Sequence, residues 1–237
     1  MALPKLTTPT YELEVPSTDE KIKYRPFLVR EEKILLIALE SGANKDIIGA
    51  VKEIVSECTF GKVDLGVLPM FDVEYIFLNI RAKSVGEIST LRLLCPDDGE
   101  TYANVDVNLS DVQVHVDEDH NNKIELTDEM GIIMTYPNID SYTDSGITDI
   151  TAANMLDVIG TCILQIYDKK GEEVFEAKDQ TKKELTEFIE QLNTKQFQDV
   201  QKFFDTMPKL KHEIEIENPK TKVKTKVALQ GLNDFFA

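Results

Sequence analysis

The sequence has little cysteine and lacks both long apolar runs and a surplus of basic residues. Its three cysteines, Cys58, Cys95 and Cys162, lie far apart and are odd in number. This pattern argues against a disulfide framework and favours reduced thiols that are buried as small hydrophobes. No apolar run approaches the roughly 20 residues that a membrane span needs, and the N-terminus lacks the basic-then-apolar order of a signal peptide. We therefore expect a chain that is made and kept in a cytoplasm.

Basic residues are in the minority. Lysine and arginine number 26 against 43 aspartates and glutamates, which gives a formal net charge of −17. Such a charge repels phosphate backbones and anionic headgroups, so we expect neither nucleic-acid nor membrane binding. The expected partners are proteins, including ones with basic faces. A length of 237 residues with 42% hydrophobic content is typical of a globular protein with a good core.

Signatures of catalysis are also missing. The sequence contains no G-x-S-x-G, no H-E-x-x-H and no glycine-rich phosphate loop. His115, His120 and His212 fall on predicted strands or at a turn tip, where we expect solvated imidazoles. Scattered carboxylates without convergent geometry do not indicate a catalytic pair. We predict no enzymatic activity and no cofactor.

One stretch, DEDHNNKIELTDE at residues 117–129, has nearly the ligand spacing of an EF-hand calcium loop. Positions 1, 3, 5, 7, 9 and 12 would be Asp117, Asp119, Asn121, the Lys123 carbonyl, Glu125 and Asp128. Two departures weaken this interpretation, because Asn122 replaces the usual glycine and Asp128 is shorter than the usual glutamate. The flanking segments also read as strands instead of helices. We favour a β-hairpin with Asn121 and Asn122 at its tip, and calcium binding is the alternative.

A second metal-like feature is the segment CPDDG at residues 95–99. It has the shape of one half of a zinc knuckle in which Asp98 replaces the second cysteine. The segment NPKTK at residues 218–222 has a similar turn centred on proline and no thiol. A structural zinc site needs four good ligands, and Cys95 is the only one present. We interpret both segments as hairpin turns, with descent from a metal-bearing ancestor as an open conjecture.

Hydrophobic periodicity divides the chain into helical and extended parts. Helical spacing predicts helices at 31–41, 44–58 with Asn44 as the cap, 69–86, 151–167, 181–192 and 197–207. The helix that follows Pro69 is apolar nearly all round, so we expect it to lie deep in the core. Alternating polarity predicts strands near 11–15 and 21–28, five strands within 87–136, and a hairpin at 212–227.

The terminal hairpin carries a charge pattern that specifies its register. If Glu217 faces Lys222, then Glu215 faces Lys224 and the isoleucines share the opposite face. A one-residue slip would move lysines to the buried side, so the pattern fixes the register more than it adds stability.

Together these elements predict an α+β fold, with a helical body, an inserted antiparallel β-rich region and a C-terminal β-hairpin. We expect residues 1–86 to form the N-terminal strands and the first half of the helical body. Residues 87–140 would be the β-rich insertion. Residues 141–237 would complete the helical body and add the hairpin, so that the helices of 30–86 and 148–207 pack together.

The third helix and its exit carry a resemblance to a known family. The segments FDVEYIFL at 71–78 and RAKSVGE at 81–87 resemble the central motif of the baseplate hub subunit family of T-even-type contractile-tailed bacteriophages. Three further stretches agree, in the same order along the chain: YRPFLVREEKILL at 24–36, MPKLKHEIEI at 207–216 and ALQGLNDFF at 228–236.

The resemblance implies a virion protein of the tail baseplate, assembled in the cytoplasm of the infected bacterium. It implies contacts with other hub or tail proteins and no catalytic residues. A chaperone that leaves before the tail is finished is the alternative function, followed by a metal-binding module.

Candidate partner-binding residues lie on the third helix and in the C-terminal tail. On the helix, the side chains of Asp72, Glu74, Arg81 and Lys83 would dock a partner, although solvation and intramolecular pairing are the favoured explanation for them. In the tail, Leu232, Phe235 and Phe236 would either fold back onto the core or anchor in a neighbouring subunit. The sequence favours neither of these two alternatives for the tail over the other.

Overall fold

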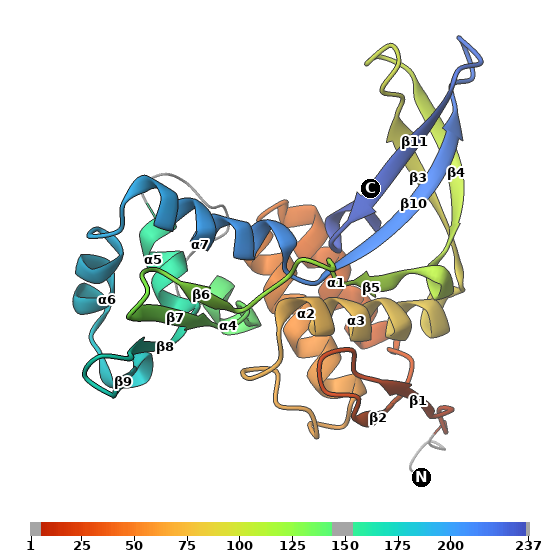
Figure 1. Cartoon of the computed structure of the whole chain (residues 1–237). Helices are drawn as coiled ribbons and strands as arrows, with labels where there is room; N and C mark the ends of the chain where they lie inside the picture. Colours follow the sequence, from red (N-terminus) through yellow and green to blue (C-terminus); the bar gives the residue numbers. More distant parts are fainter. Residues whose placement is uncertain (1–5, 144–153, 236–237) are drawn as a thin grey trace. The chain divides into compact units, whose positions relative to one another are not determined.

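The structure of the chain is a computed structural model that describes residues 6–143 and 154–235. The chain forms two compact units, one from residues 1–115 and 209–237 and the other from residues 116–208. Figure 1 shows the order of the helices and strands in both units. Every strand pairing among the described residues is antiparallel. This mixture of helices and antiparallel sheets confirms the predicted α+β class.

The first unit begins with a hairpin of β1 (Tyr11–Glu14) and β2 (Lys21–Tyr24). Three helices follow, α1 (Val29–Ser41), α2 (Asn44–Cys58) and α3 (Met70–Val85). Helix α1 ends at Gly42, whose φ of 66° is left-handed and suits a glycine after a helix. The predicted cap at Asn44 is wrong. Asn44 is the first residue of α2, and Ala43 occupies the N-cap position without a side-chain hydrogen bond to the helix.

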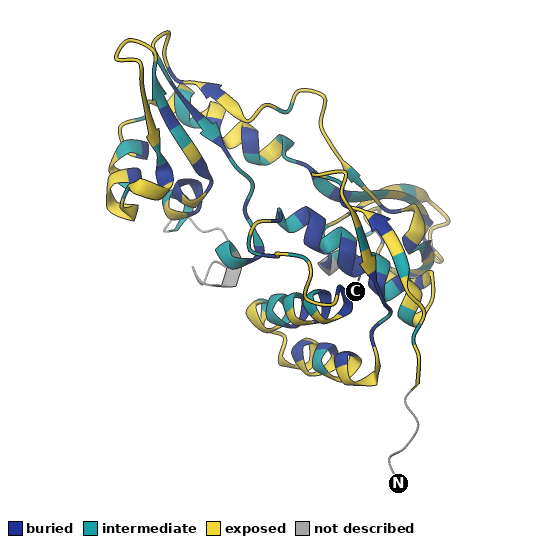
Figure 2. Cartoon of the chain, turned by 90° about the horizontal axis from the view of Figure 1, so that it is seen from below, coloured by how far each residue is buried: buried dark blue, intermediate teal, exposed yellow. Residues whose placement is uncertain are grey.

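Helix α3 is the buried centre of the first unit, as its apolar composition predicts. It follows Pro69, ends at Gly86, and buries residues on all sides, including Val73, Ile76, Phe77 and Ile80 at 0% exposure. Figure 2 shows long buried stretches in the interior and exposed residues along the outer helices and strands. Helix α3 contacts α2, β5 and β10, so it links the helical and β-rich parts of the unit.

Two long hairpins complete the first unit. Strands β3 (Ile88–Leu94) and β4 (Tyr102–Asn108) form one, and β10 (Lys209–Glu217) and β11 (Lys224–Gln230) form the other. Strand β5 (Gln113–His115) pairs with β10 after the short helical turn η1 (Leu109–Asp111), and a similar turn, η3 (Asn233–Phe235), follows β11. The base of these strands packs on α3 through Leu78, Leu91, Leu210 and Leu229.

The terminal hairpin forms, but its predicted register is wrong by two residues. Glu217 lies opposite Lys224, and Ile214 lies opposite Val227. The reason is a longer turn, in which Lys222 takes a left-handed φ of 65° and the Asn218 N–H bonds to the Val223 carbonyl at 2.9 Å. A shift of two residues keeps each side chain on its predicted face. The expected charges still pair diagonally, since Lys224 Nζ lies 2.9 Å from Glu215 Oε1.

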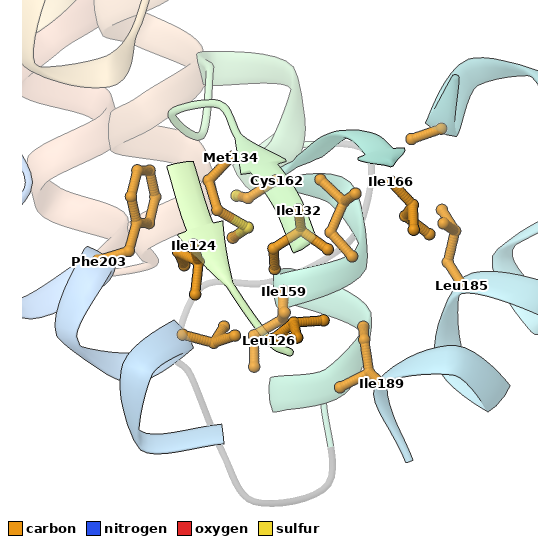
Figure 3. Packing of buried hydrophobic residues seen from close by; sticks show 13 residues of the cluster. Ile124, Leu126, Ile132, Met134, Ile159, Cys162, Ile166, Leu185, Ile189 and Phe203 are labelled. Atoms are coloured by element: carbon orange, nitrogen blue, oxygen red, sulfur yellow. The ribbon is translucent and has the colours of Figure 1, made fainter. Parts of the chain in front are cut away.

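The second unit contains a four-stranded sheet in the order β6 (Lys123–Glu125), β7 (Met130–Met134), β8 (Ile163–Asp168) and β9 (Glu173–Glu176). Its helical elements are α4 (Ile139–Thr143), α5 (Met155–Thr161), α6 (Lys182–Ile189), α7 (Thr194–Thr206) and the turn η2 (Ala177–Asp179). Figure 3 shows the core of this unit, which contains Ile132 and Met134 of β7, Ile159 of α5 and Phe203 of α7. The capping box predicted at Thr181 and Glu184 is present at the start of α6.

Two predictions about the second unit are wrong. The helix expected over 151–167 ends at Thr161, and the next residues form strand β8; residues 151–153 lie outside the described part. Ile163 and Ile166 fit helical spacing, whereas in the strand a shift in the β7–β8 register at Ile133/Met134 lies between them. The hairpin expected around Asn121 and Asn122 does not form either. The five strands expected in 87–136 are all present, but β5 pairs with β10 and β6 pairs with β7.

The borders of the two units lie at residues 115/116 and 208/209. Helices α1 to α3 belong to the first unit and α5 to α7 to the second, whereas the sequence predicts one helical body. The domain borders that the sequence places at 86/87 and 140/141 stay a prediction.

Candidate interaction surface

Asp72, near the start of α3, is fully buried. Its carboxylate accepts hydrogen bonds from the Ser17 N–H at 3.2 Å and from the Ser17 hydroxyl. Burial raises the pKa of Asp72, and the hydrogen bonds from Ser17 act in the opposite direction. The side chain therefore ties the turn between β1 and β2 to α3.

Glu74, two residues further along the buried helix, contacts the C-terminal tail. Its Oε1 accepts a hydrogen bond from the Leu232 N–H at 3.4 Å, next to Gly231 with its left-handed φ of 65°. Burial raises the pKa of Glu74 to about 7, against the effect of that hydrogen bond. Leu232 is 6% exposed, and Phe235 is fully buried against residues such as Leu78. In this structure the tail is folded back onto the core, and Phe236 lies outside the described residues.

The two basic residues near the end of α3 also make intramolecular contacts. Arg81 Nη2 donates to Ser89 Oγ at 3.3 Å, and burial lowers the pKa of Arg81. Lys83 Nζ lies 2.5 Å from Glu87 Oε1 and 5.6 Å from the centroid of the Tyr11 ring. Partner binding through the four charged residues of α3 and through the tail stays a prediction.

Two of the predicted residues, Arg81 and Phe235, line the same cleft. The cleft has a volume of about 280 Å³ and is formed by α1, the end of α3 and strand β3. Its apolar walls include Leu36 and Leu39 of α1 and Val85 of α3. The cleft can therefore accept apolar side chains next to a guanidinium group.

Helix α1, which forms one wall of this cleft, exposes several apolar side chains to solvent among its charged ones. Val29 is 79% exposed, Leu36 is 54% exposed and Ile37 is 56% exposed. Near the cleft, Val85 and Ile88 add exposures of 65% and 60%. We call these five residues the α1 surface. Exposed apolar groups that gather beside a cleft are typical of a protein-binding site, whereas scattered ones are ordinary.

Helical spacing groups Ile34, Leu35, Ala38 and Leu39 on one face of this helix, and it does not indicate that neighbouring apolar residues such as Leu36 stay uncovered. The residues that α1 buries are Glu31, Leu35 and Ala38. Glu31 turns inward because its carboxylate accepts hydrogen bonds from Arg25 Nη2 at 3.0 Å and from the Leu28 N–H at 2.6 Å. Burial would raise the pKa of Glu31, but these bonds and one from Arg30 outweigh it and lower the pKa. The run ILLIAL at 34–39 was the available signal, since one helix face is too narrow to hold it.

His120 is not a freely solvated side chain as predicted, because it is half-buried and contacts Phe203, Thr206 and Tyr136 of the second unit. Its ring lies 5.2 Å from Phe203, its Nδ1 is 3.0 Å from Thr206 Oγ1, and its Nε2 is 2.9 Å from the Tyr136 hydroxyl. Thr206 already donates its proton to the Lys202 carbonyl at 2.8 Å, so it accepts the N–H of Nδ1 and leaves Nε2 to accept from Tyr136. Burial lowers the pKa of His120, although Asp117 acts to raise it.

The loop that resembles a calcium site uses its side chains in turns. Asp117 Oδ1 accepts the Asp119 N–H at 2.9 Å, and Asn121 Oδ1 accepts the Lys123 N–H at 2.9 Å. Across residues 6–143 and 154–235, no group of three or more histidine, cysteine, aspartate or glutamate side chains is placed to hold a metal ion.

Comparison with known proteins assigns the family. A family model described as T4 bacteriophage base plate protein matches residues 8–237. The chain belongs to this family. It is therefore a bacteriophage base plate protein and a component of the virion tail, which confirms the baseplate part of the resemblance seen in the sequence. No match was found among curated proteins or among solved structures. No helix in the described parts of this base plate protein has the length and apolarity to cross a membrane.

Proposed function

We propose that this base plate protein is a structural, non-catalytic component of the baseplate hub. In this proposal it acts through contacts with other hub or tail proteins while the baseplate assembles in the host cytoplasm. The observation that carries the proposal is the α1 surface, where Leu36, Ile37 and Val85 remain exposed beside a cleft. Burying one such side chain in a partner stabilises a complex by about 1.5–3 kcal/mol, so a few of them can dominate an interface.

The rigidity of the helix behind this surface supports the proposal. Helix α3 is packed on all sides, and Asp72 and Glu74 bond it to segments near both ends of the chain. Val85 and the cleft wall that α3 supplies are therefore held in place before a partner binds, which lowers the entropic cost of association.

The test is a pull-down of tagged protein from infected cells. We expect the wild type to recover a small set of tail proteins and no nucleic acid. A double variant, Leu36→Asp with Ile37→Asp, places two charges on the α1 surface and replaces no buried residue. The recovery of tail proteins with this variant should fall at least about tenfold. The matched control is Val67→Asp, which also charges an exposed apolar residue of the first unit, 73% exposed, away from this surface. Equal recovery with the double variant and the control would contradict the proposal.

Mass spectrometry of purified virions separates the hub component from an assembly chaperone. A resident hub component is present in mature tails, whereas a chaperone is present in infected cells and missing from finished particles. Elemental analysis of the purified protein tests the metal-binding module, since that function requires bound calcium or zinc.

A further inference from the structure

The tips of the two long hairpins have the same turn. Each starts with a buried residue, Cys95 in one and Asn218 in the other, at 0% and 1% exposure, and each continues with a proline. The fifth residue of each turn donates its N–H to the carbonyl of the first, at 3.0 Å from Gly99 and at 2.9 Å from Lys222. The two fifth residues also share a left-handed φ, 66° at Gly99 and 65° at Lys222. A lysine rarely adopts this conformation, so the turn shape prevails over the residue's own preference.

The two turns bind each other through Asp97. Its carboxylate oxygens lie 2.9 and 3.1 Å from the Nδ2 of Asn218, and the Thr221 hydroxyl donates to Oδ2 at 2.5 Å. The bonds from Thr221 and Asn218 lower the pKa of Asp97. Cys95, the first residue of one turn, packs with Ala103 and Ile216 in a small apolar cluster. Figure 1 shows the two hairpins running side by side toward these tips.

Asp98 and Asn218 also make hydrogen bonds within their own turns. Asp98 accepts the Thr101 N–H at 3.0 Å and the Thr101 hydroxyl at 2.6 Å. Asn218 Oδ1 accepts the Lys220 N–H at 2.8 Å and the Thr221 N–H at 3.2 Å. The first and fourth positions of the two turns are Cys95, Asp98, Asn218 and Thr221, which is the spacing at which paired turns supply four ligands to a structural zinc ion.

We propose that these paired tips are a knuckle of the zinc-binding type in which hydrogen bonds centred on Asp97 take the place of the ion. The clasp joins the ends of the hairpins β3–β4 and β10–β11, so that the two act as one arm. It needs no metal because Asn218 and Thr221 already bond to Asp97 of the other turn, while Asp98 is held by Thr101 within its own turn. This proposal is independent of the hub function, since it concerns the shape of the arm and not its partner.

The first test restores the ligands. A triple variant, Asp98→Cys with Asn218→Cys and Thr221→Cys, would place four thiols at the tips together with Cys95. Titrated with Co²⁺ under reducing conditions, it should bind one ion per chain and show the thiolate charge-transfer and strong visible absorption of tetrahedral cobalt. The triple serine variant at the same positions is the control and should show neither. A folded cysteine variant without tetrahedral absorption would overturn the proposal, because the four positions would not converge.

The second test keeps the native tips and removes the clasp. Asp97→Ala should speed amide hydrogen exchange at Gly99 and Lys222 by about tenfold, because Asn218 and Thr221 lose their common acceptor. The matched control is Asp106→Ala on β4, since Asp106 also accepts a hydroxyl bond, from Thr90 at 2.6 Å, but lies away from the tips. Unchanged exchange in Asp97→Ala would overturn the clasp whatever the cobalt result.

Discussion

Replacement of Phe235 by alanine should destabilise the first unit strongly. Phe235 is fully buried and packs in the cluster that contains Leu78, Leu210 and Leu229. Losing a fully buried phenylalanine side chain removes up to about 3 kcal/mol of transfer free energy. The cavity left between β10, β11 and α3 adds to this, so the expected loss in free energy of unfolding is about 3–5 kcal/mol.

Urea unfolding followed by circular dichroism gives the free energy, and hydrogen exchange at α3 assigns the loss to the first unit. This assignment is needed because the chain has two units, which need not unfold together. The matched control is Phe175→Ala on β9, where the ring is 42% exposed, and the expected loss is below about 1 kcal/mol. A loss of less than about 1 kcal/mol for Phe235→Ala would refute the docked tail and leave Phe235 free to anchor in a neighbour.

Three further predictions concern charged groups. Because the folded pKa of His120 lies below its unfolded value of about 6.5, stability should fall as the pH drops below about 6.5, and His120→Gln should remove that slope in urea titrations. Glu74 acts with the opposite sign, since its pKa rises to about 7 from 4.5. The contribution of Glu74 to the free energy of unfolding is present at low pH and is lost as the pH rises through about 7. The free energy of unfolding of Glu74→Gln should therefore change less than that of the wild type between pH 4.5 and 8. Arg25→Met should cost about 3–5 kcal/mol in urea unfolding, because it leaves the buried Glu31 without its 3.0 Å partner. A cost below about 1 kcal/mol would show that Arg30 and the Leu28 N–H satisfy that carboxylate alone.

Local patterns in the sequence were sufficient for most elements of the fold. The buried α3 follows from the apolar run after Pro69, and the five strands within 87–136 follow from alternation between polar turns. Strand pairing was harder, because β5 joins β10 across almost a hundred residues and nothing in either segment specifies that partner. Strand β8 was mistaken for helix because Ile163 and Ile166 are three residues apart, a helical spacing, and the irregular pairing with β7 that breaks the strand period leaves no signal in the sequence.

The candidate surface depended on contacts that no local pattern contains. The burial of Glu31 depends on Arg25, six residues earlier and outside the helix, and the exposure of Leu36 depends on which elements pack against α1. The tail likewise has no sequence feature that separates docking on its own core from docking on a neighbour. Its burial depends on the shape of the pocket that Leu78, Leu210 and Leu229 form together.

The most direct test of the proposed function is site-specific photo-cross-linking in infected cells. A photoreactive amino acid at position 36, in the α1 surface, should yield a covalent adduct with another tail protein that is absent without irradiation. The same probe at position 62, an exposed lysine in a loop of the first unit, is the control and should yield little adduct. Equal cross-linking at both positions, or none at position 36 while the protein is incorporated into tails, would contradict an interface at α1.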